Sequence, residues 1–213
     1  MKKYELTDIR SGNLRRIRAL RDIPRYNVRA GDLGGWIESE ENLSQFDDCW
    51  IGEDAQAEGH ALIDGNAWVG GTATVCENAF ICDNARVDGD TGIAGYANVL
   101  DNAQVRGNAF VSGFVEIKGN ACVYGNARIG GITCLQANAR VQSSRDYLSI
   151  GPMYCSNDYA TFYRTETGIW VCRGRFNGSI DEFEVAVRKT HGNSQCACAH
   201  LAAIELAKIQ IEF

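Results

Sequence analysis

The polar side chains with the clearest chemical potential gather between positions 156 and 191. They combine hydroxyl, amide and carboxylate groups with an aromatic ring, three arginines and a histidine: Ser156, Asn157, Asp158, Thr161, Tyr163, Arg164, Arg173, Arg175 and His191. Guanidinium and hydroxyl groups hold phosphates, and aromatic rings stack on bases. These residues therefore predict a pocket for a small anionic ligand such as a nucleotide. The alternative is that they only fasten a β-hairpin to its neighbours.

The histidines and cysteines give weaker signals. His60, His191 and His200 are the candidates for a general base, and nothing in the sequence supplies a partner that would orient them. Cys196 and His200 are four residues apart on an expected helix, but Cys198 points elsewhere and no Cys-x2-Cys spacing exists. We therefore expect no catalytic residue, no metal and no cofactor.

A six-residue repeat without insertions runs from Ala55 to Ser144 and forms the expected scaffold for these side chains. Small residues recur at every sixth position up to Ala139, and an aliphatic residue follows two positions later from Ile63 to Val141. Residues two apart in a strand point to the same side. Glycine and asparagine, which tolerate positive φ, often fill the next two positions. Each hexad thus predicts one short strand and one turn, and such a fixed period is typical of a solenoid.

The pattern Val-x-Gly-Asn-Ala-x, as in Val105-Arg106-Gly107-Asn108-Ala109, resembles the hexapeptide repeat of left-handed parallel β-helices. That family folds three hexads into each coil, so the resemblance implies a mainly β, left-handed parallel β-helix of about five coils. We expect an N-terminal β cap over 1–48, the helix over 49–144 and a small C-terminal α+β domain over 145–213. Members are often trimers and many are acyltransferases, which makes a homotrimer the favoured state and acyl transfer a third functional reading.

The N-terminal segment is expected to close one end of the solenoid. It is basic before position 30, and the alternation over 16–19 predicts a half-buried strand. An open solenoid end exposes apolar side chains and an unpaired strand edge. We therefore expect Leu33 or Trp36 to cover the open core.

The C-terminal segment is expected to close the other end. The stretches 159–164 and 169–173 predict a β-hairpin, and Ser179 caps a helix that ends at Gly192. A second helix is predicted over about 194–211. With both ends capped, a discrete oligomer is favoured over a fibre.

Apolar side chains also fall on outward positions of the repeat. They cluster on one side of the expected prism: Leu62, Phe80, Cys82, Leu100, Phe110 and Phe114. Soluble monomers seldom expose such patches, so this side predicts a contact between copies of the chain. The alternative is that the C-terminal segment folds back over the patch.

Composition excludes several classes of protein. The chain has 213 residues, 45% of them hydrophobic, with only two prolines, which indicates a folded protein. A net charge of −6 disfavours binding to nucleic acid polymers. No stretch is typical of a signal peptide or a membrane span, so we expect a cytoplasmic protein without membrane contact. Its nine scattered cysteines predict free thiols.

Three motifs near the ends carry a more specific resemblance. The stretches 31–38, 150–163 and 176–192 are similar to those of phage and prophage hexapeptide-repeat proteins that are often labelled polymer-forming cytoskeletal-like. This likeness covers essentially the whole chain, although Tyr154-Cys155-Ser156 stands where the group usually carries Gly-Ser-Arg. It implies a non-catalytic phage protein of the host cytoplasm that sequesters a nucleotide signal of host defence. The alternative is a structural assembly module without a small ligand.

Overall fold

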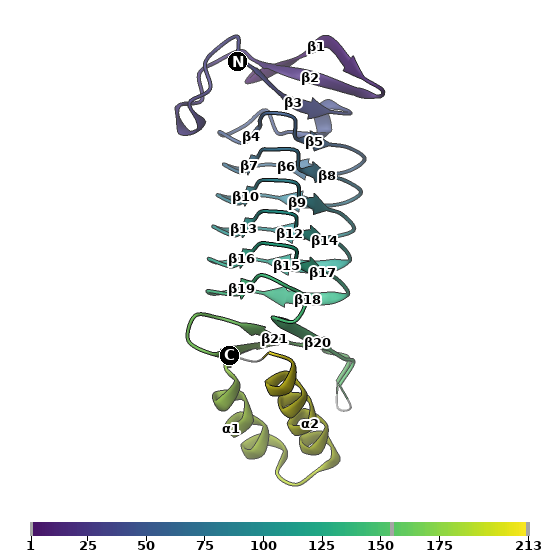
Figure 1. Ribbon diagram of the computed structural model, residues 1–213, viewed down its shortest axis with the longest axis vertical. Helices are drawn as coiled ribbons and strands as arrows, with labels where there is room; N and C mark the ends of the chain where they lie inside the picture. Colours follow the sequence, from purple (N-terminus) through teal and green to yellow (C-terminus); the bar gives the residue numbers. More distant parts are fainter. Residues whose placement is uncertain (1, 154–155, 212–213) are drawn as a thin grey trace.

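The computed structural model describes residues 2–153 and 156–211, and its elements stack along one long axis (Figure 1). A solenoid forms the middle, an antiparallel β cap closes its N-terminal end, and a small α+β domain closes the other end. The predicted fold class, a mainly β protein with a parallel β-helix between two caps, is confirmed. Tyr154 and Cys155 of the motif over 150–163 lie outside the described residues.

Three parallel sheets form the faces of the solenoid. Each strand pairs with the strand one coil further on, as Ile63 pairs with Ile81 and Val69 with Val87. Face 1 contains β3 (Leu33–Ile37), β5 (Gln56–Ala57), β8 (Thr74–Val75), β11 (Gly92–Ile93), β14 (Phe110–Val111) and β17 (Arg128–Ile129). Face 2 contains β4 (Trp50–Ile51), β7 (Trp68–Val69), β10 (Arg86–Val87), β13 (Gln104–Val105), β16 (Cys122–Val123) and β19 (Arg140–Val141). Face 3 contains β6 (Leu62–Ile63), β9 (Phe80–Ile81), β12 (Asn98–Val99), β15 (Phe114–Ile117) and β18 (Ile132–Leu135).

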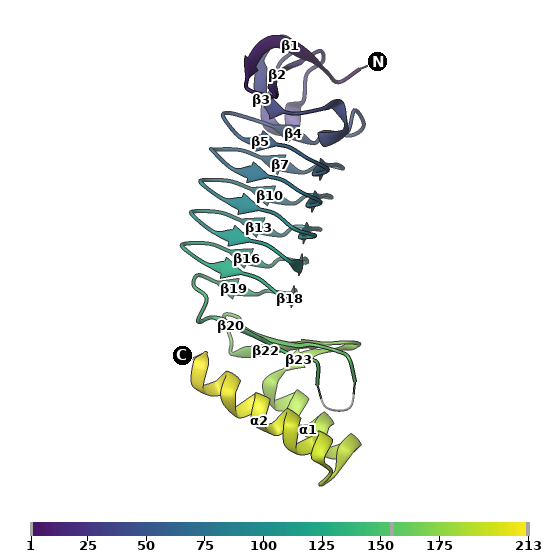
Figure 2. The same cartoon turned by 90° about the vertical axis from the view of Figure 1, so that its right-hand side faces the viewer.

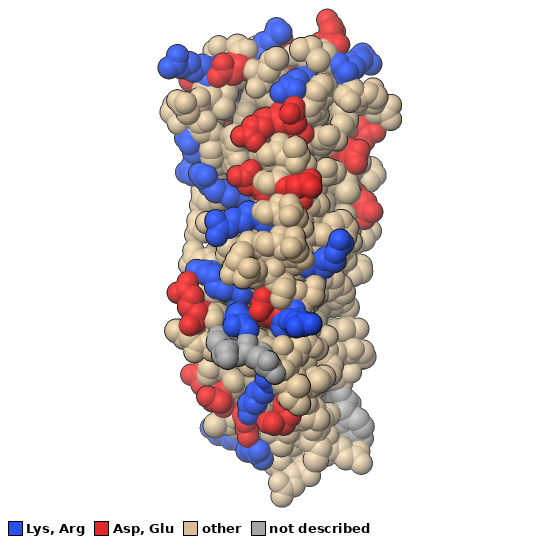
Figure 3. Space-filling view, viewed as in Figure 1, with Lys and Arg blue, Asp and Glu red and all other residues tan. Residues whose placement is uncertain are grey.

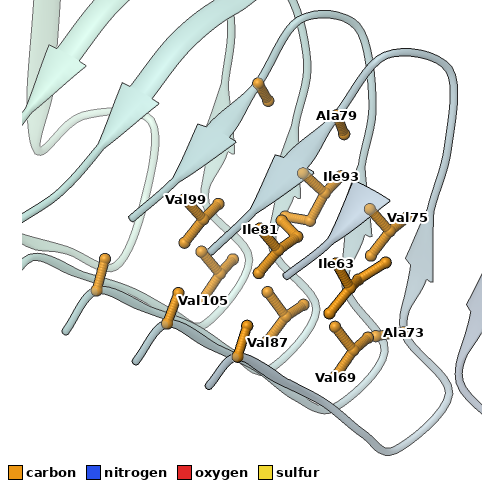
Figure 4. Close-up of a cluster of buried hydrophobic side chains, with 14 of the residues drawn as sticks. Ile63, Val69, Ala73, Val75, Ala79, Ile81, Val87, Ile93, Val99 and Val105 are labelled. Atoms are coloured by element: carbon orange, nitrogen blue, oxygen red, sulfur yellow. The ribbon is translucent and has the colours of Figure 1, made fainter. Parts of the chain in front are cut away.

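The aliphatic column of the repeat fills the interior of the solenoid. Ile63, Ile81 and Val99 stack on face 3, and Val69 and Val87 stack on face 2 (Figure 4). None of these side chains is exposed. The alanine column is buried beside them, and its small side chains let the three faces approach one another.

The turns between strands adopt positive φ at one position in most hexads. At Gly95 the angle is 71°, and a methyl group there would lie 2.5 Å from the backbone nitrogen of Gly113 in the next coil. Where an acidic residue takes this position, its carboxylate accepts a hydrogen bond from the coil that follows. Glu77 Oε2 accepts from the Gly95 N–H at 2.8 Å, and Asp101 Oδ2 accepts from the Gly119 N–H at 2.9 Å. These bonds connect successive turns along the axis.

The solenoid has about six coils, one more than the hexads from Ala55 onward predict. The additional first coil is formed by β3, Leu43 and β4, which pair in parallel with β5, Ile63 and β7. The periodic pattern does not reveal this coil because the connection between Ile37 and Trp50 includes a short 3-10 helix, η2 (Glu40–Asn42), which breaks the six-residue register.

The N-terminal cap is a hairpin of β1 (Tyr4–Ser11) and β2 (Leu14–Ala19) that continues antiparallel into β3. Tyr4 and Ile17 of the cap, both fully buried, continue the core of the solenoid and cover it at this end. The prediction that Leu33 or Trp36 does so is wrong, since Leu33 is 44% exposed and Trp36 is half-buried on the outer side. The inner position next to Trp36 belongs to Gly35, where a methyl group would lie 2.5 Å from Ile51 Cγ2. Of the larger side chains of β3, only Ile37 is buried in the core.

The C-terminal domain begins with a four-stranded antiparallel sheet, so the predicted hairpin gains one strand on each side. In order, its strands are β20 (Tyr147–Ile150), β21 (Ala160–Arg164), β22 (Ile169–Arg173) and β23 (Phe176–Ser179). The sheet lies across the end of the solenoid, and both helices lie on its opposite face (Figure 2). Each strand of the sheet therefore has one side towards the solenoid and one towards the helices.

Both predicted helices are confirmed. Helix α1 (Ile180–His191) begins at the Ser179 capping box and ends at Gly192, and α2 (Gln195–Gln210) begins after the Ser194 cap. Among the described residues, no helix combines the length and the apolar character needed to cross a membrane.

Candidate functional site

The structure separates the nine predicted ligand residues into several environments. The cause is strand alternation in β21 and β22, which sends neighbouring side chains to opposite sides of the terminal sheet. Tyr163 belongs to the core that fills the solenoid, whereas Phe162 next to it packs with the helices. Asn157 lies exposed in the loop that precedes β21. A single pocket formed by all nine residues is therefore excluded.

Two of the nine residues face the solenoid and fasten the sheet to it. Thr161 Oγ1 accepts a hydrogen bond from the Cys134 N–H of the last coil at 3.1 Å, and its side chain is 1% exposed. Tyr163 is fully buried, and burial raises the pKa of its phenol well above the ordinary value. At these two positions the alternative interpretation, a fastening role, fits the contacts.

A second group lies on the helix side of the sheet. Arg173 Nη2 donates to Ser156 Oγ at 2.8 Å, and the His191 ring stacks on the His200 ring with centroids 5.5 Å apart. His200 is fully buried; its Nδ1 lies 2.6 Å from the Cys196 carbonyl oxygen and so must be the donor. Burial, followed by the nearby positive charge of Arg173, lowers the pKa of His200. The imidazole is therefore kept neutral at the junction of α1 and α2.

The same junction holds the one cluster of metal-ligand types found among the described residues. His191, Cys196 and His200 each place one ligand atom within 4.8 Å of the others. Cys196 is disulfide-bonded, so its sulfur is no thiolate donor, and this finding overturns the expectation that all thiols are free. The other described cysteines are free. The absence of a metal site stays a prediction.

Three predicted residues line a cavity of about 480 Å³ between the last coil and the terminal sheet. Asp158, Thr161 and Arg175 come from the C-terminal domain, and Glu116 and Lys118 come from the solenoid. Lys118 and Glu116 form an ion pair. Two basic and two acidic side chains thus surround this cavity, and its charges balance.

The remaining predicted residue, Arg164, does not line this cavity. It lines a hollow of about 510 Å³, and its Nε donates to Asp146 Oδ1 at 2.9 Å. The hollow shares Tyr124 and Arg140 with a neighbouring one of about 610 Å³ on the outer side of face 2. We call the two together the arginine groove; its lining includes Asn102, Arg106, Asn120, Tyr124, Arg140, Asp146, Arg164 and Glu166.

Guanidinium groups and an aromatic ring dominate the arginine groove. The Arg106 guanidinium lies 5.6 Å from the centre of the Tyr124 ring, a cation–π contact, and pairs with no carboxylate among the described residues. Arg140 is held by the carbonyl oxygens of Asn120 and Ala139, at 2.9 and 3.0 Å, and by Glu166 at 3.1 Å. The groove therefore presents fixed donors beside a ring.

The charge of the arginine groove is opposite to that of the whole chain. Its three arginines, Arg106, Arg140 and Arg164, face two carboxylates, Asp146 and Glu166, whereas the chain carries −6. In Figure 3, Lys and Arg side chains follow the left-hand side of the solenoid, and acidic side chains gather above and towards the centre. An anion is therefore attracted locally to a protein that repels it on average.

Sequence reasoning missed this groove, although a signal was present. Arg86 and Arg140 occupy the same outward column of face 2, three coils apart, and Arg106 lies in the first of the two coils between them. Writing the repeat in rows of eighteen residues brings these arginines together with Tyr124. A further cation–π contact continues the pattern, since the Arg86 guanidinium lies 5.7 Å from the Tyr26 ring centre.

The predicted contact side remains open. The C-terminal domain lies beyond the last coil, so the alternative that it folds back over the patch is contradicted (Figures 1 and 2). Phe110 is 42% and Phe114 is 62% exposed, whereas the other four predicted side chains are half-buried on face 3 and its turn: Leu62, Phe80, Cys82 and Leu100. Tyr96 and Ile132, which were not predicted, extend the patch, and the Tyr96 ring stacks on Phe114 with centroids 5.0 Å apart.

No protein-family model matches the chain, and no curated protein matches it significantly.

Proposed function

We propose that this chain is a non-catalytic, homo-oligomeric β-solenoid protein that binds a small anionic ligand of the nucleotide class in the arginine groove. The observation that carries the proposal is the guanidinium–aromatic arrangement of Arg106, Tyr124 and Arg140 on an otherwise acidic protein. Three of the nine residues suggested by the sequence, Asp158, Thr161 and Arg175, line a charge-balanced cavity instead, which supports an anion less well.

The groove offers a separate contact for each part of a nucleotide. Arg106 has no carboxylate partner to displace, so a phosphate gains a charge-assisted bond there at little cost. Arg140 is already oriented by backbone carbonyl oxygens, which reduces the entropy lost on binding. The Tyr124 ring and the amides of Asn102 and Asn120 line the same hollow and suit stacking on a base and hydrogen bonding to its edge. Hollows of about 510 and 610 Å³ lie within the usual range for small-molecule sites.

The exposed aromatic patch supports a homo-oligomer, with a trimer favoured by the resemblance to hexapeptide-repeat proteins. Tyr96, Phe114 and Ile132 form an apolar column along one corner of the solenoid, and each is 45–62% exposed. An exposed column of this kind is unusual on a monomer. Both solenoid ends are covered, which favours a closed assembly over a fibre.

The biological role is inferred from the resemblance to phage proteins. A protein that binds a nucleotide signal in the host cytoplasm, without turning it over, would lower the free concentration of that signal and blunt the defence that depends on it. No membrane and no nucleic acid polymer is needed for this role. A third reading, acyl transfer, has less support because His60 is exposed on a turn of the solenoid and no described side chain orients it.

The second candidate function is a structural assembly module without a small ligand. It is favoured by the intramolecular contacts of Thr161 and Arg173, two residues of the predicted site that fasten one part of the protein to another. In this case the arginine groove would serve only solubility or a protein contact.

Calorimetry with mono-, di- and cyclic nucleotides distinguishes the ligand-binding function from the purely structural one. We expect at least one class to bind, and Arg106→Gln to weaken it by about tenfold or more, because a charge-assisted bond contributes about 1.5–3 kcal/mol. Arg128 provides a matched control: its guanidinium lies 5.9 Å from the Phe110 ring centre on face 1, so Arg128→Gln removes the same kind of contact elsewhere. If no class of nucleotide binds, or if both variants lose the same affinity, the arginine groove is not the binding site.

A further inference from the structure

Two free cysteines meet where the terminal sheet covers the solenoid. Cys134 lies on β18 in the last coil, and Cys172 lies on β22 of the terminal sheet. Thr161 connects them, because it is the register partner of Cys172 and accepts a hydrogen bond from the Cys134 N–H at 3.1 Å. Both side chains line the same cavity between the last coil and the sheet. Side chains 38 positions apart in the sequence thus form one dithiol.

The surroundings give the two sulfurs different roles. Interaction with Cys134, followed by the charge of Lys118 and a hydrogen bond from Gln136, lowers the pKa of the Cys172 thiol against the opposing effects of burial and of the Glu116 charge. Gln136 Nε2 lies 3.2 Å from the Cys172 sulfur. The same interaction, together with burial, raises the pKa of Cys134. Of the two thiols, Cys172 is therefore the more acidic and the attacking group, and Cys134 is the resolving one.

The dithiol is within reach of small molecules. Both cysteines line the cavity of about 480 Å³ at this junction, and Cys134 is only partly buried. Lys118 and Arg175 line the same cavity together with Glu116 and Asp158, so a small molecule that carries both ammonium and carboxylate groups finds a partner for each charge.

We propose that Cys172 and Cys134 form a dithiol site that undergoes thiol–disulfide exchange with small disulfides that carry both charges, such as oxidised glutathione. In the first step the Cys172 thiolate attacks one sulfur of the disulfide, which forms a mixed disulfide and releases one thiolate. In the second step the Cys134 sulfur attacks the Cys172 sulfur, loses its proton and releases the second thiol. The two cysteines are oxidised to one disulfide, and the small disulfide is reduced to two thiols. The product links the last coil covalently to the terminal sheet.

This site is independent of the arginine groove, which shares none of its residues. The new bond would hold the C-terminal domain on the solenoid end and raise the melting temperature of the oxidised protein. Its reversal by a dithiol reductant would restore the original value.

The test is peptide mass spectrometry on the full chain, reduced and then exposed to oxidised glutathione. We expect a Cys134–Cys172 linked peptide in the wild type, distinguished by its sequence from the disulfide at Cys196. Cys134→Ser should accumulate the mixed disulfide at Cys172, since it lacks the second thiol, whereas the control Cys122→Ser should form the link normally. Circular dichroism of the reduced variants checks that each is folded.

A second measurement needs no substitution. In the reduced wild type, iodoacetamide at neutral pH should alkylate buried Cys172 faster than exposed Cys198, because the thiolate is the reactive form. Lys118→Gln or Gln136→Leu should slow the alkylation of Cys172 and leave the alkylation rate of Cys198 unchanged. The proposal is overturned if Cys198 reacts first, or if folded Cys134→Ser traps no mixed disulfide at Cys172.

Discussion

Replacing Gly95 by alanine tests how closely the coils are stacked. Gly95 has φ of 71°, and its new methyl group would lie 2.5 Å from the Gly113 nitrogen and 3.0 Å from the Gly113 oxygen. That oxygen accepts the Tyr96 N–H at 2.9 Å, so moving the next coil away weakens a hydrogen bond of the stack. Gly131 is the matched control, because its φ is 73° but nothing lies within 4 Å of a methyl group there.

The two substitutions share the backbone cost and differ in crowding. Alanine in the left-handed region costs about 1–2 kcal/mol, partly offset by about 0.4–1 kcal/mol through the lower entropy of the unfolded chain. Gly131→Ala should therefore lower the free energy of unfolding by about 1 kcal/mol. Gly95→Ala adds overpacking of about 1–3 kcal/mol against backbone atoms that cannot rotate away.

Thermal and urea unfolding, followed by circular dichroism, measures both variants. At roughly 2–4 °C per kcal/mol for a chain of this size, Gly95→Ala should melt several degrees below Gly131→Ala. Equal melting temperatures would show that the coils can part at this turn without cost, and would refute the close stacking on which the argument depends.

Three further outcomes are expected. Ile81→Ala should destabilise the protein by about 2–5 kcal/mol in urea unfolding, because its side chain is fully buried in the solenoid; a loss below 1 kcal/mol would contradict a packed interior. Burial lowers the pKa of His200 below its ordinary value of about 6.5, so protonation favours the unfolded chain. The free energy of unfolding should therefore be highest above pH 6.5 and decline below it. His200→Gln should reduce the difference in the free energy of unfolding between pH 7.5 and pH 5.5. Phe114→Lys should dissociate the proposed oligomer in light scattering while leaving the melting temperature of the single chain nearly unchanged; a wild type of one-chain mass would remove the basis for this contact.

The sequence was most informative where one local rule governs many residues. The hexads predict which side chains fill the solenoid because an inward position recurs every second residue of each strand and every sixth residue of the chain. The bounds of α1 and α2 were also predictable, since Ser179, Gly192 and Ser194 act on the adjacent backbone. The first coil was not predictable, because its strands β3 and β4 are separated by a connection without hexad spacing.

The candidate site was harder to predict because it depends on which side of a sheet each residue faces. Thr161 and Arg173 are close in the hairpin but point to opposite sides of it, towards the solenoid and the helices respectively. Conversely, Arg86 and Arg140 are 54 positions apart yet occupy one column, because three coils separate them. Alternation and coil register, and not proximity in sequence, decide which polar groups meet.

The binding of an anion in the arginine groove is tested most directly by a crystal structure of the protein with its best-binding nucleotide. We predict phosphate density against the guanidinium groups of Arg106 and Arg140, with the base on the Tyr124 ring. A nucleotide ordered elsewhere on the chain, with the groove empty at a concentration that saturates binding in solution, would contradict the proposed function.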